Sequence, residues 1–194
     1  MIKKNILLIS LFIIIISFSC KKTYDTDGKS IVINEVMPVN STVVADQNGQ
    51  YDDWIELFNL TSTKIDITGY YLSDSKNNPK KWKFPSGTYI EGNEYLIIWA
   101  DKDTTQAGLH TNFSLSSLGE KVIFSNSDGS QIDKVEYPAQ TLELSYSRFP
   151  DGTGFFRWQN PSFNITNGSS KYYFKGLYNR LMEHRLVNID FNEV

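Results

Sequence analysis

The chain has 194 residues and a formal net charge of −3, because 22 Asp and Glu outnumber 19 Lys and Arg. A single cysteine excludes an intramolecular disulfide. The acidic balance disfavours a general binder of polyanions such as nucleic acid, because that affinity comes chiefly from Lys and Arg. The length suits one domain that is large enough to bury its own core.

The first 19 residues have the pattern of an export signal. Lys3 and Lys4 precede an apolar run over 6–18, and small Ser19 precedes Cys20. The run is too short to span a bilayer comfortably. Its end resembles that of a bacterial lipoprotein signal, in which the cleaved N-terminal cysteine carries lipid. We therefore expect a signal peptide over 1–19 and a covalent lipid on Cys20; an uncleaved anchor or an ordinary secretory signal is the alternative.

Residues 20–30 are polar and rich in turn formers, which predicts a flexible tether between lipid and domain. Removal of residues 1–19 lowers the Lys and Arg count from 19 to 17 and leaves the 22 acids in place. Between residues 31 and 166 there are 10 Lys and Arg against 17 Asp and Glu, so the domain itself has a net charge near −7.

Short runs rich in Ile, Val, Tyr, Phe and Trp, each closed by turn formers, follow from residue 31 onward. They predict strands that include residues 31–36, 54–59, 95–100, 121–125 and 131–137. In the second run Ile55 and Leu57 face one way, and Trp54, Glu56 and Phe58 face the other. Many short strands separated by turns predict an all-β sandwich or barrel.

Three of these segments allow finer predictions. The run Tyr95–Ala100 shows no alternation, which predicts a central strand buried on both faces. Residues 126–130 contain Asp128-Gly129 and predict a hairpin between two strands. The apolar positions shift after Ile132, which predicts a bulge near Asp133.

The blocks IVINEV, YDDWIELFN, IDITGYYLSDS, KWKFP and EYLIIWAD, all between residues 31 and 101, resemble the lamin tail domain family. The resemblance continues over 109–137 and 145–154 to NPSFNITN at 160–167. It implies an immunoglobulin-like β-sandwich over 31–167. The family occurs in nuclear lamins and in many secreted or surface bacterial proteins.

The segment 168–194 lies outside this resemblance. Between residues 172 and 186 its apolar side chains recur at spacings of three and four, which predicts a short amphipathic C-terminal helix. Packing against the sandwich is the favoured interpretation of this helix. Docking of a partner or of a membrane surface is the alternative.

Candidate chemistry in the sequence is sparse. Only His110 and His184 occur, without a second His or a Cys at metal-ligand spacing, so we expect no zinc site. Glu35, Asp53 and Glu56 are candidate acid–base groups, but strand and turn acids more commonly cap turns or bond to the backbone. We therefore expect no catalytic residues and no cofactor besides the lipid.

Two weaker candidate binding sites can be named. The loop 37–53 concentrates hard oxygen ligands that could bind calcium, although its spacing departs from that of an EF-hand: Asp46, Asn48, Asp52 and Asp53. The second is a basic and aromatic patch that could bind nucleic acid or glycans: Lys80, Lys81, Trp82 and Lys83. Packing of Trp82 in the core, with the lysines on the opposite face, is the favoured interpretation of this patch.

These observations predict a non-catalytic binding or tethering module, lipid-anchored at the outer membrane or cell surface of the bacterial envelope. Its expected partners are the membrane and an unidentified protein or polysaccharide. One alternative is an accessory domain of a secreted hydrolase system, because bacterial lamin tail domains often accompany hydrolases. Another is a nucleic-acid-binding module, which the lamin relatives suggest and the acidic charge disfavours. We expect recognition to use the loop 37–53, and an exposed edge strand is the alternative.

Overall fold

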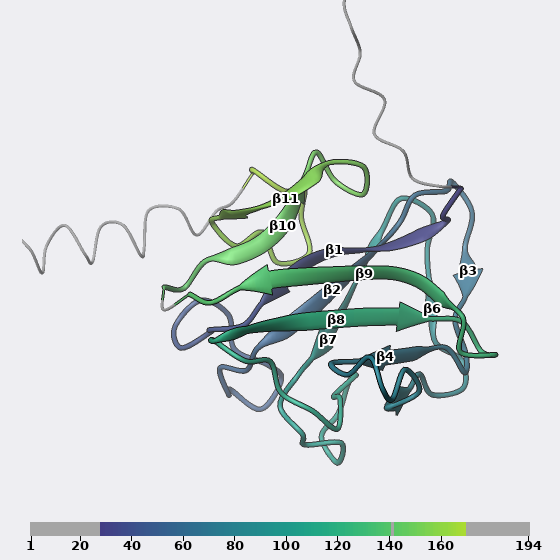
Figure 1. Cartoon of the computed structure of the whole chain (residues 1–194), viewed down its shortest axis with the longest axis horizontal. Coiled ribbons are helices and arrows are strands. Elements are labelled where there is room, and N and C mark those ends of the chain that lie inside the picture. Colours follow the sequence, from purple (N-terminus) through teal and green to yellow (C-terminus); the bar gives the residue numbers. More distant parts are fainter. Residues whose placement is uncertain (1–27, 141, 170–194) are drawn as a thin grey trace, which may run out of the picture.

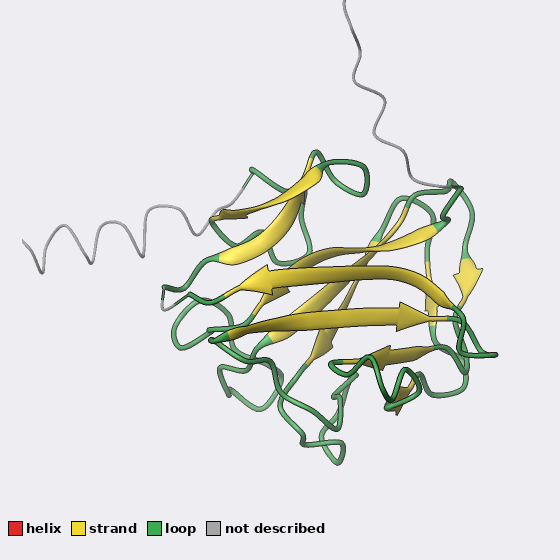
Figure 2. Cartoon of the chain, viewed as in Figure 1, coloured by secondary structure: helices red, strands yellow, loops and turns green. Residues whose placement is uncertain are grey.

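The fold is a sandwich of antiparallel sheets, seen in a computed structural model that describes residues 28–140 and 142–169 (Figure 1). The described residues form strands, turns and loops and no helix (Figure 2). In this part of the chain, accordingly, no helix is long and apolar enough to cross a membrane. The predicted helix over 168–194, the signal peptide and Cys20 lie outside the described residues, apart from residues 168 and 169.

Within the described residues, eleven strands build three sheets. They are β1 (Ile31–Met37), β2 (Trp54–Asn59), β3 (Ile65–Asp66), β4 (Tyr71–Ser73), β5 (Trp82–Lys83), β6 (Tyr89–Ile90), β7 (Tyr95–Trp99), β8 (Gly119–Ser125), β9 (Gln131–Pro138), β10 (Ser145–Phe149) and β11 (Phe155–Gln159). A five-stranded sheet has the order β11-β10-β1-β2-β7, and a four-stranded sheet has the order β5-β4-β8-β9. A small third sheet pairs β3 with β6. Figure 1 shows β8 and β9 in front of β1, β2 and β7.

The main core lies between the two larger sheets. The five-stranded sheet contributes Ile33, Leu57 and Ile98, and the four-stranded sheet contributes Leu72 and Phe124, all of them buried. Burial of an aliphatic or aromatic side chain of this size stabilises a fold by roughly 1.5–3 kcal/mol. The predicted alternation in β2 is confirmed, because Ile55 and Leu57 enter this core whereas Trp54 enters a separate cluster.

A bulge at Asn34 adjusts the side-chain alternation of β1. Ile33 pairs with Leu57 and Glu35 pairs with Glu56, so Asn34 is left between two registers. Ile33 and Val36, three positions apart, consequently both face the core. The same device occurs in β9, where the register moves from Phe124↔Asp133 to Ser125↔Gln131 and confirms the predicted bulge near Asp133.

The prediction that residues 95–100 form a central strand is wrong. Strand β7 lies at the edge of its sheet, although both of its faces are covered. Ile98 points into the main core, and Ile97 and Trp99 pack in the second cluster on the opposite face. An uninterrupted apolar run therefore indicates that both faces of a strand are covered. It does not indicate whether the strand lies in the centre or at the edge of its sheet.

The second cluster lies on the outer face of the five-stranded sheet. Met37, Trp54 and Trp99 form its buried centre, and Val43, Val44 and Phe163 pack against them. The ring centroids of Trp54 and Phe163 are 5.2 Å apart in an edge-to-face arrangement. The loop after β1 and the segment 160–169 thus cover this face, so each contributes to the fold.

A buried carboxylate joins the two sheets where β9 meets β1. Asp133 Oδ2 accepts a hydrogen bond from the Ile33 backbone N–H at 2.9 Å and from Arg148 Nη2 at 3.1 Å. Lys29 Nζ donates to Asp133 Oδ1 at 3.2 Å. Arg148 Nε also donates to the Ile33 carbonyl at 2.9 Å. These bonds fix the register between the sheets at one edge, where apolar packing alone would not specify it.

Candidate functional site

Two glutamates lie side by side on the outer face of the five-stranded sheet and have no exposed surface. Glu35 of β1 and Glu56 of β2 are direct cross-strand partners. Both are 0% exposed. The sequence interpretation placed such acids at turns or sheet edges, and that placement is wrong for this pair. Bonding to the backbone, the other part of that interpretation, is confirmed for both.

The segment 160–169 closes over this pair through its backbone N–H groups. Ser162 N donates to Glu35 Oε1 at 3.0 Å, and Asn164 N donates to Glu56 Oε2 at 2.9 Å. Asn34 Nδ2 donates to the remaining oxygen, Glu56 Oε1, at 2.9 Å. Each glutamate therefore holds one backbone group of the covering segment, which lies far away in the sequence.

Asp151 and Asn34 extend this network toward the turn between β10 and β11. Asp151 Oδ1 accepts from Asn34 Nδ2 at 3.0 Å and from Asn167 N at 3.1 Å, and Asp151 Oδ2 accepts from Tyr95 Oη at 3.0 Å. Asn34 Oδ1 accepts from Gly152 N at 2.8 Å. Gly152 has a φ of +65°, a left-handed conformation that favours glycine, and a Cβ there would lie 2.4 Å from the Leu60 side chain.

Burial dominates the electrostatics of the two glutamates. It raises the pKa of Glu35, and it raises the pKa of Glu56 well above the usual range with help from the Glu35 charge. Ser162 Oγ lies 2.6 Å from Glu35 Oε2 and 2.5 Å from Asn167 Oδ1, yet a hydroxyl has a single proton to donate. When Glu35 is protonated, it can donate to Ser162 Oγ while Ser162 donates to Asn167 Oδ1.

The arrangement restricts what these acids can do chemically. A general acid or base must come within hydrogen-bond reach of its substrate. Glu35 and Glu56 have no exposed surface, so a substrate could reach them only if the segment 160–169 moved away. Their geometry instead suits attachment of that segment. Asp53, the third candidate acid, is apart from this pair and accepts from the Asn40 backbone N–H, while burial raises its pKa to about 7.

His110 is also enclosed. Its side chain is 1% exposed, and Nδ1 lies 2.6 Å from Asp101 Oδ2. The imidazole ring stacks on Trp99 with an interplanar angle of 26°. Among residues 28–140 and 142–169, no three His, Cys, Asp or Glu side chains converge in a way that could hold a metal ion.

The candidate calcium residues form a tight turn in the loop after β1. Asp46 Oδ1 accepts from Asn48 N and Gln50 N, each at 2.8 Å, so this oxygen caps the turn. Asn48 Nδ2 donates to Gln106 Oε1 at 2.7 Å. The other oxygens, Asp46 Oδ2 and Asp52 Oδ2, are buried and have no hydrogen-bond partner within the described residues. Burial, with the charges of Asp101 and Asp46, raises the pKa of Asp52.

The structure divides the predicted basic patch. Trp82 is enclosed in the main core and its ring centroid lies 4.7 Å from that of Phe84, so its indole is not available to stack on a ligand. Lys81 Nζ lies 2.7 Å from both carboxylate oxygens of Asp74. Lys80 and Lys83 are exposed, and Lys80 Nζ lies 5.5 Å from the centre of the Tyr71 ring.

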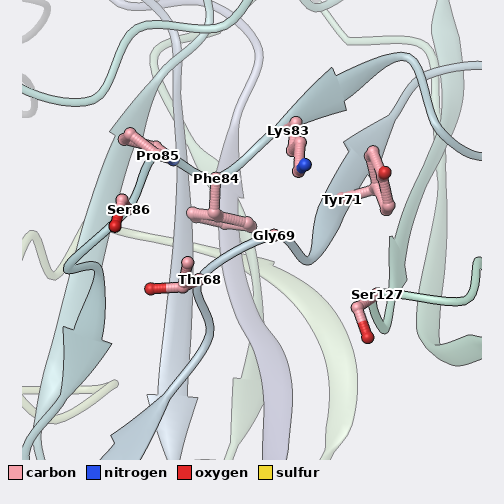
Figure 3. A pocket seen from close by; sticks show the side chains of 8 residues that line it. All are labelled: Thr68, Gly69, Tyr71, Lys83, Phe84, Pro85, Ser86 and Ser127. Atoms are coloured by element: carbon pink, nitrogen blue, oxygen red, sulfur yellow. The ribbon is translucent and has the colours of Figure 1, made fainter.

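Lys83 opens onto a surface hollow of about 500 Å³ beside β4 and β5. Figure 3 shows its lining: Thr68, Gly69, Tyr71, Lys83, Phe84, Pro85, Ser86 and Ser127. Of the four residues of the predicted patch, only Lys83 belongs to it. Tyr71 belongs to β4, and the other lining residues lie in or beside the turns of ITGYY, FPSG and SNSDG, which were interpreted only as connections between strands. Their hydroxyl content was the signal that the sequence interpretation missed.

One comparison with known proteins identifies a family. A family model, the Lamin Tail Domain, matches residues 25–139, which is more than half of the chain. The match spans β1 to β9, whereas β10, β11 and the segment 160–169 lie beyond it. A comparison with curated proteins gave no match. This all-β chain belongs to the lamin tail domain family.

Proposed function

We propose that this protein is a non-catalytic binding module of the bacterial cell envelope, held to a membrane by lipid on Cys20. In this proposal the residues 1–19 direct export and are removed, and the residues 20–30 form a flexible tether that separates the domain from the membrane. Lamin tail domains of secreted and surface bacterial proteins provide the precedent for this location.

The enclosure of the groups best suited to acid–base chemistry is the observation that carries the proposal. Glu35 and Glu56 are 0% exposed, and His110 is 3% exposed. Each is bonded to another part of the same chain. Because these buried groups stabilise the fold, a partner can contact only the outer surface of the domain. This supports display and binding over catalysis.

Charge separates the proposal from the nucleic-acid alternative. The segment 31–166 carries 17 acids and 10 Lys and Arg. Among those cations, Lys81 is paired with Asp74, Arg148 with Asp133 and Lys121 with Glu136. Nucleic-acid binding draws its affinity from unpaired cations that release counterions. The domain therefore suits partners with few charges better than it suits a polynucleotide.

Replacement of Cys20 tests the anchor. We expect Cys20→Ala to move the protein from the membrane fraction to the soluble fraction, because a covalent lipid supplies the membrane affinity. Thr23→Ala, a substitution in the tether, is the matched control and should stay in the membrane fraction. Retention of Cys20→Ala in the membrane with unchanged electrophoretic mobility would refute lipidation.

A panel of nuclease, phosphatase and glycosidase assays tests the non-catalytic part. We expect the purified protein to show no turnover above that of Glu56→Gln. Turnover that Glu56→Gln abolishes would refute the proposal and assign the buried acids to catalysis. Turnover that survives Glu56→Gln would also refute it and place an active site elsewhere in the chain.

A further inference from the structure

We propose that the hollow beside β4 and β5 binds a sugar that carries one carboxylate, such as a uronic acid unit of an envelope polysaccharide. This inference names the ligand class for the binding module proposed above and rests on that function. The hollow has a volume of about 500 Å³. Small-ligand sites commonly have volumes between roughly 300 and 1,000 Å³.

The strand register places a cation and an aromatic ring side by side at this hollow. Tyr71 of β4 and Lys83 of β5 are direct cross-strand partners. Their neighbours Leu72 and Trp82 also pair and enter the core, so Tyr71 and Lys83 share the outer face. Side chains opposite each other in an antiparallel pair have Cβ atoms about 5 Å apart. A ligand in the hollow therefore meets both.

Lys83 is available to a ligand. Within residues 28–140 and 142–169, no carboxylate forms an ion pair with its ammonium group, in contrast to Lys81 beside Asp74. Gly69, at a φ of +80°, lies beside the Lys83 stem, and a Cβ there would be 3.4 Å from Lys83 Cε, an ordinary van der Waals contact. An unpaired ammonium beside a hollow suits one carboxylate, which forms a charge-assisted hydrogen bond with it.

Hydroxyl groups surround the rest of the hollow. Figure 3 shows Ser86 on one side and Ser127 on the other, with the buried Phe84 ring between them. In the described part of the chain, the hydroxyls of Ser86, Ser127 and Tyr71 have no hydrogen-bond partner. Thr68 Oγ1 is already engaged, because it accepts from Gly87 N at 3.0 Å. Free hydroxyls and an aromatic ring match the hydroxyls and C–H faces of a sugar.

The surrounding charge limits the ligand to few negative groups. The segment 31–166 has a net charge near −7, and Asp128 follows Ser127 directly. A dense polyanion would meet this field, whereas a single carboxylate can reach Lys83 while neutral sugar units contact the hydroxyls. This favours an isolated uronic acid over a polynucleotide.

A matched pair of sugars tests the proposal. Methyl glucuronoside and methyl glucoside differ only in the carboxylate, and each can be titrated into isotope-labelled full-length protein extracted from membranes in detergent. We expect amide NMR shifts at Gly69, Ser86 and Ser127, and a dissociation constant on the order of 1 mM for the glucuronoside, as suits a small ligand with few contacts. The glucoside should bind at least about ten-fold more weakly, because it lacks the charge-assisted bond to Lys83.

Two variants test which side chains bind the sugars. Lys83→Gln should remove the preference for the glucuronoside, and Tyr71→Ala should weaken both sugars. Lys134→Gln, which removes an exposed lysine from β9 of the same sheet, should keep the preference. Equal binding of the two sugars, shifts confined to other residues, or no shift at all would overturn the proposal. Stronger binding of a short oligothymidylate at these residues would also overturn it and favour nucleic acid.

The outcomes distinguish this inference from the proposed function. If neither sugar binds and Cys20→Ala still leaves the membrane, the ligand class is wrong and the anchored module stands. If the glucuronoside binds at the hollow and Cys20 carries no lipid, the site stands and the anchor is wrong.

Discussion

The two faces of the five-stranded sheet are covered by different means: the inner face packs apolar side chains, whereas the outer face combines the apolar cluster around Trp54 with a buried polar network. The inner face packs Ile33, Leu57 and Ile98 against the apolar side chains of the second sheet. The outer face places Glu35 and Glu56 beneath a segment that bonds to both of them. Apolar packing is non-directional and tolerates change, whereas a buried polar network specifies one arrangement and is costly when a member is missing. The inner face therefore supplies most of the stability, and the outer face specifies where the segment 160–169 lies.

Truncation of a side chain in the inner core should cause the largest loss in the free energy of unfolding. Phe124 is 0% exposed and contacts the rings of Tyr70 and Phe84. We expect Phe124→Ala to lower the free energy of unfolding by about 4 kcal/mol, since it removes buried surface and leaves a cavity. Denaturant unfolding measures this. Leu118→Ala, at a position that is 82% exposed, is the control and should change stability by less than about 0.5 kcal/mol.

A loss below about 1 kcal/mol for Phe124→Ala would show that the two sheets do not share the core described above.

Removal of one member of the polar network should have the next largest effect. Asn34→Ala leaves Glu56 Oε1, Asp151 Oδ1 and Gly152 N each short of a hydrogen bond. We expect a loss of about 3 kcal/mol, because buried polar groups without partners cost about 1–3 kcal/mol each and partial relaxation recovers some of it. Asn77→Ala, at an exposed position, should be nearly neutral. If the two asparagine variants unfold alike, the outer-face network does not stabilise the fold.

Much of the fold could be predicted from sequence, and the outer-face network could not. Alternation at Ile55 and Leu57, and the turn formers between runs, indicate local geometry and were sufficient to predict β1, β2, β7, β8 and β9. Burial of Glu35 depends on Ser162, which is 127 positions away. A local sequence pattern cannot predict a hydrogen-bond partner at that separation. Distant covering segments are also the reason why the acids appeared to be turn or edge residues.

The residues of the candidate sites also divide into those that a local sequence pattern could predict and those that depend on distant packing. Lys83 could be named from the sequence because it belongs to a conspicuous basic run. Ser86 and Ser127 could not be named, because their convergence depends on how two turns pack beside β4. Trp82 was a candidate in the same run, and the pairing of Leu72 with Trp82 places it in the core instead.

The pH dependence of stability should test the buried carboxyl groups next, of which Glu35 and Glu56 lie on the outer face and Asp53 lies apart from them. Apolar side chains do not titrate, whereas burial raises the pKa of Glu35 and Glu56 from 4.5 and raises that of Asp53 from 3.8 to about 7. A raised carboxyl pKa means that the folded state binds more protons than the unfolded state, so its stabilising contribution is full at low pH and is lost as pH rises. For Asp53 the loss spans the range from 3.8 to about 7.

Chemical denaturation at several pH values between 4 and 8 measures this trend. We expect the free energy of unfolding to fall as pH rises, and Asp53→Asn to flatten the part of the curve below pH 7. Glu136→Gln, at an exposed position on β9, is the control and should leave the slope unchanged. A stability that rises over this whole range would contradict the raised pKa values.

Calcium should have the smallest effect, and it tests the loop that covers part of the outer face. Asp46 Oδ1 is already occupied by two backbone N–H groups. We expect 5 mM calcium to change the melting temperature by less than about 1 °C relative to 5 mM magnesium, because a bound cation stabilises only in proportion to its affinity. A larger rise that Asp46→Asn abolishes would assign the loop as a calcium site.

The intact mass of the protein extracted from membranes tests the central claim of an anchored display module most directly. We predict a chain that begins at Cys20 and has a mass increase that corresponds to covalent lipid on that cysteine. The increase should be absent from Cys20→Ala. A membrane-extracted chain that retains Met1, or that begins near residue 20 with an unmodified cysteine, would contradict the account.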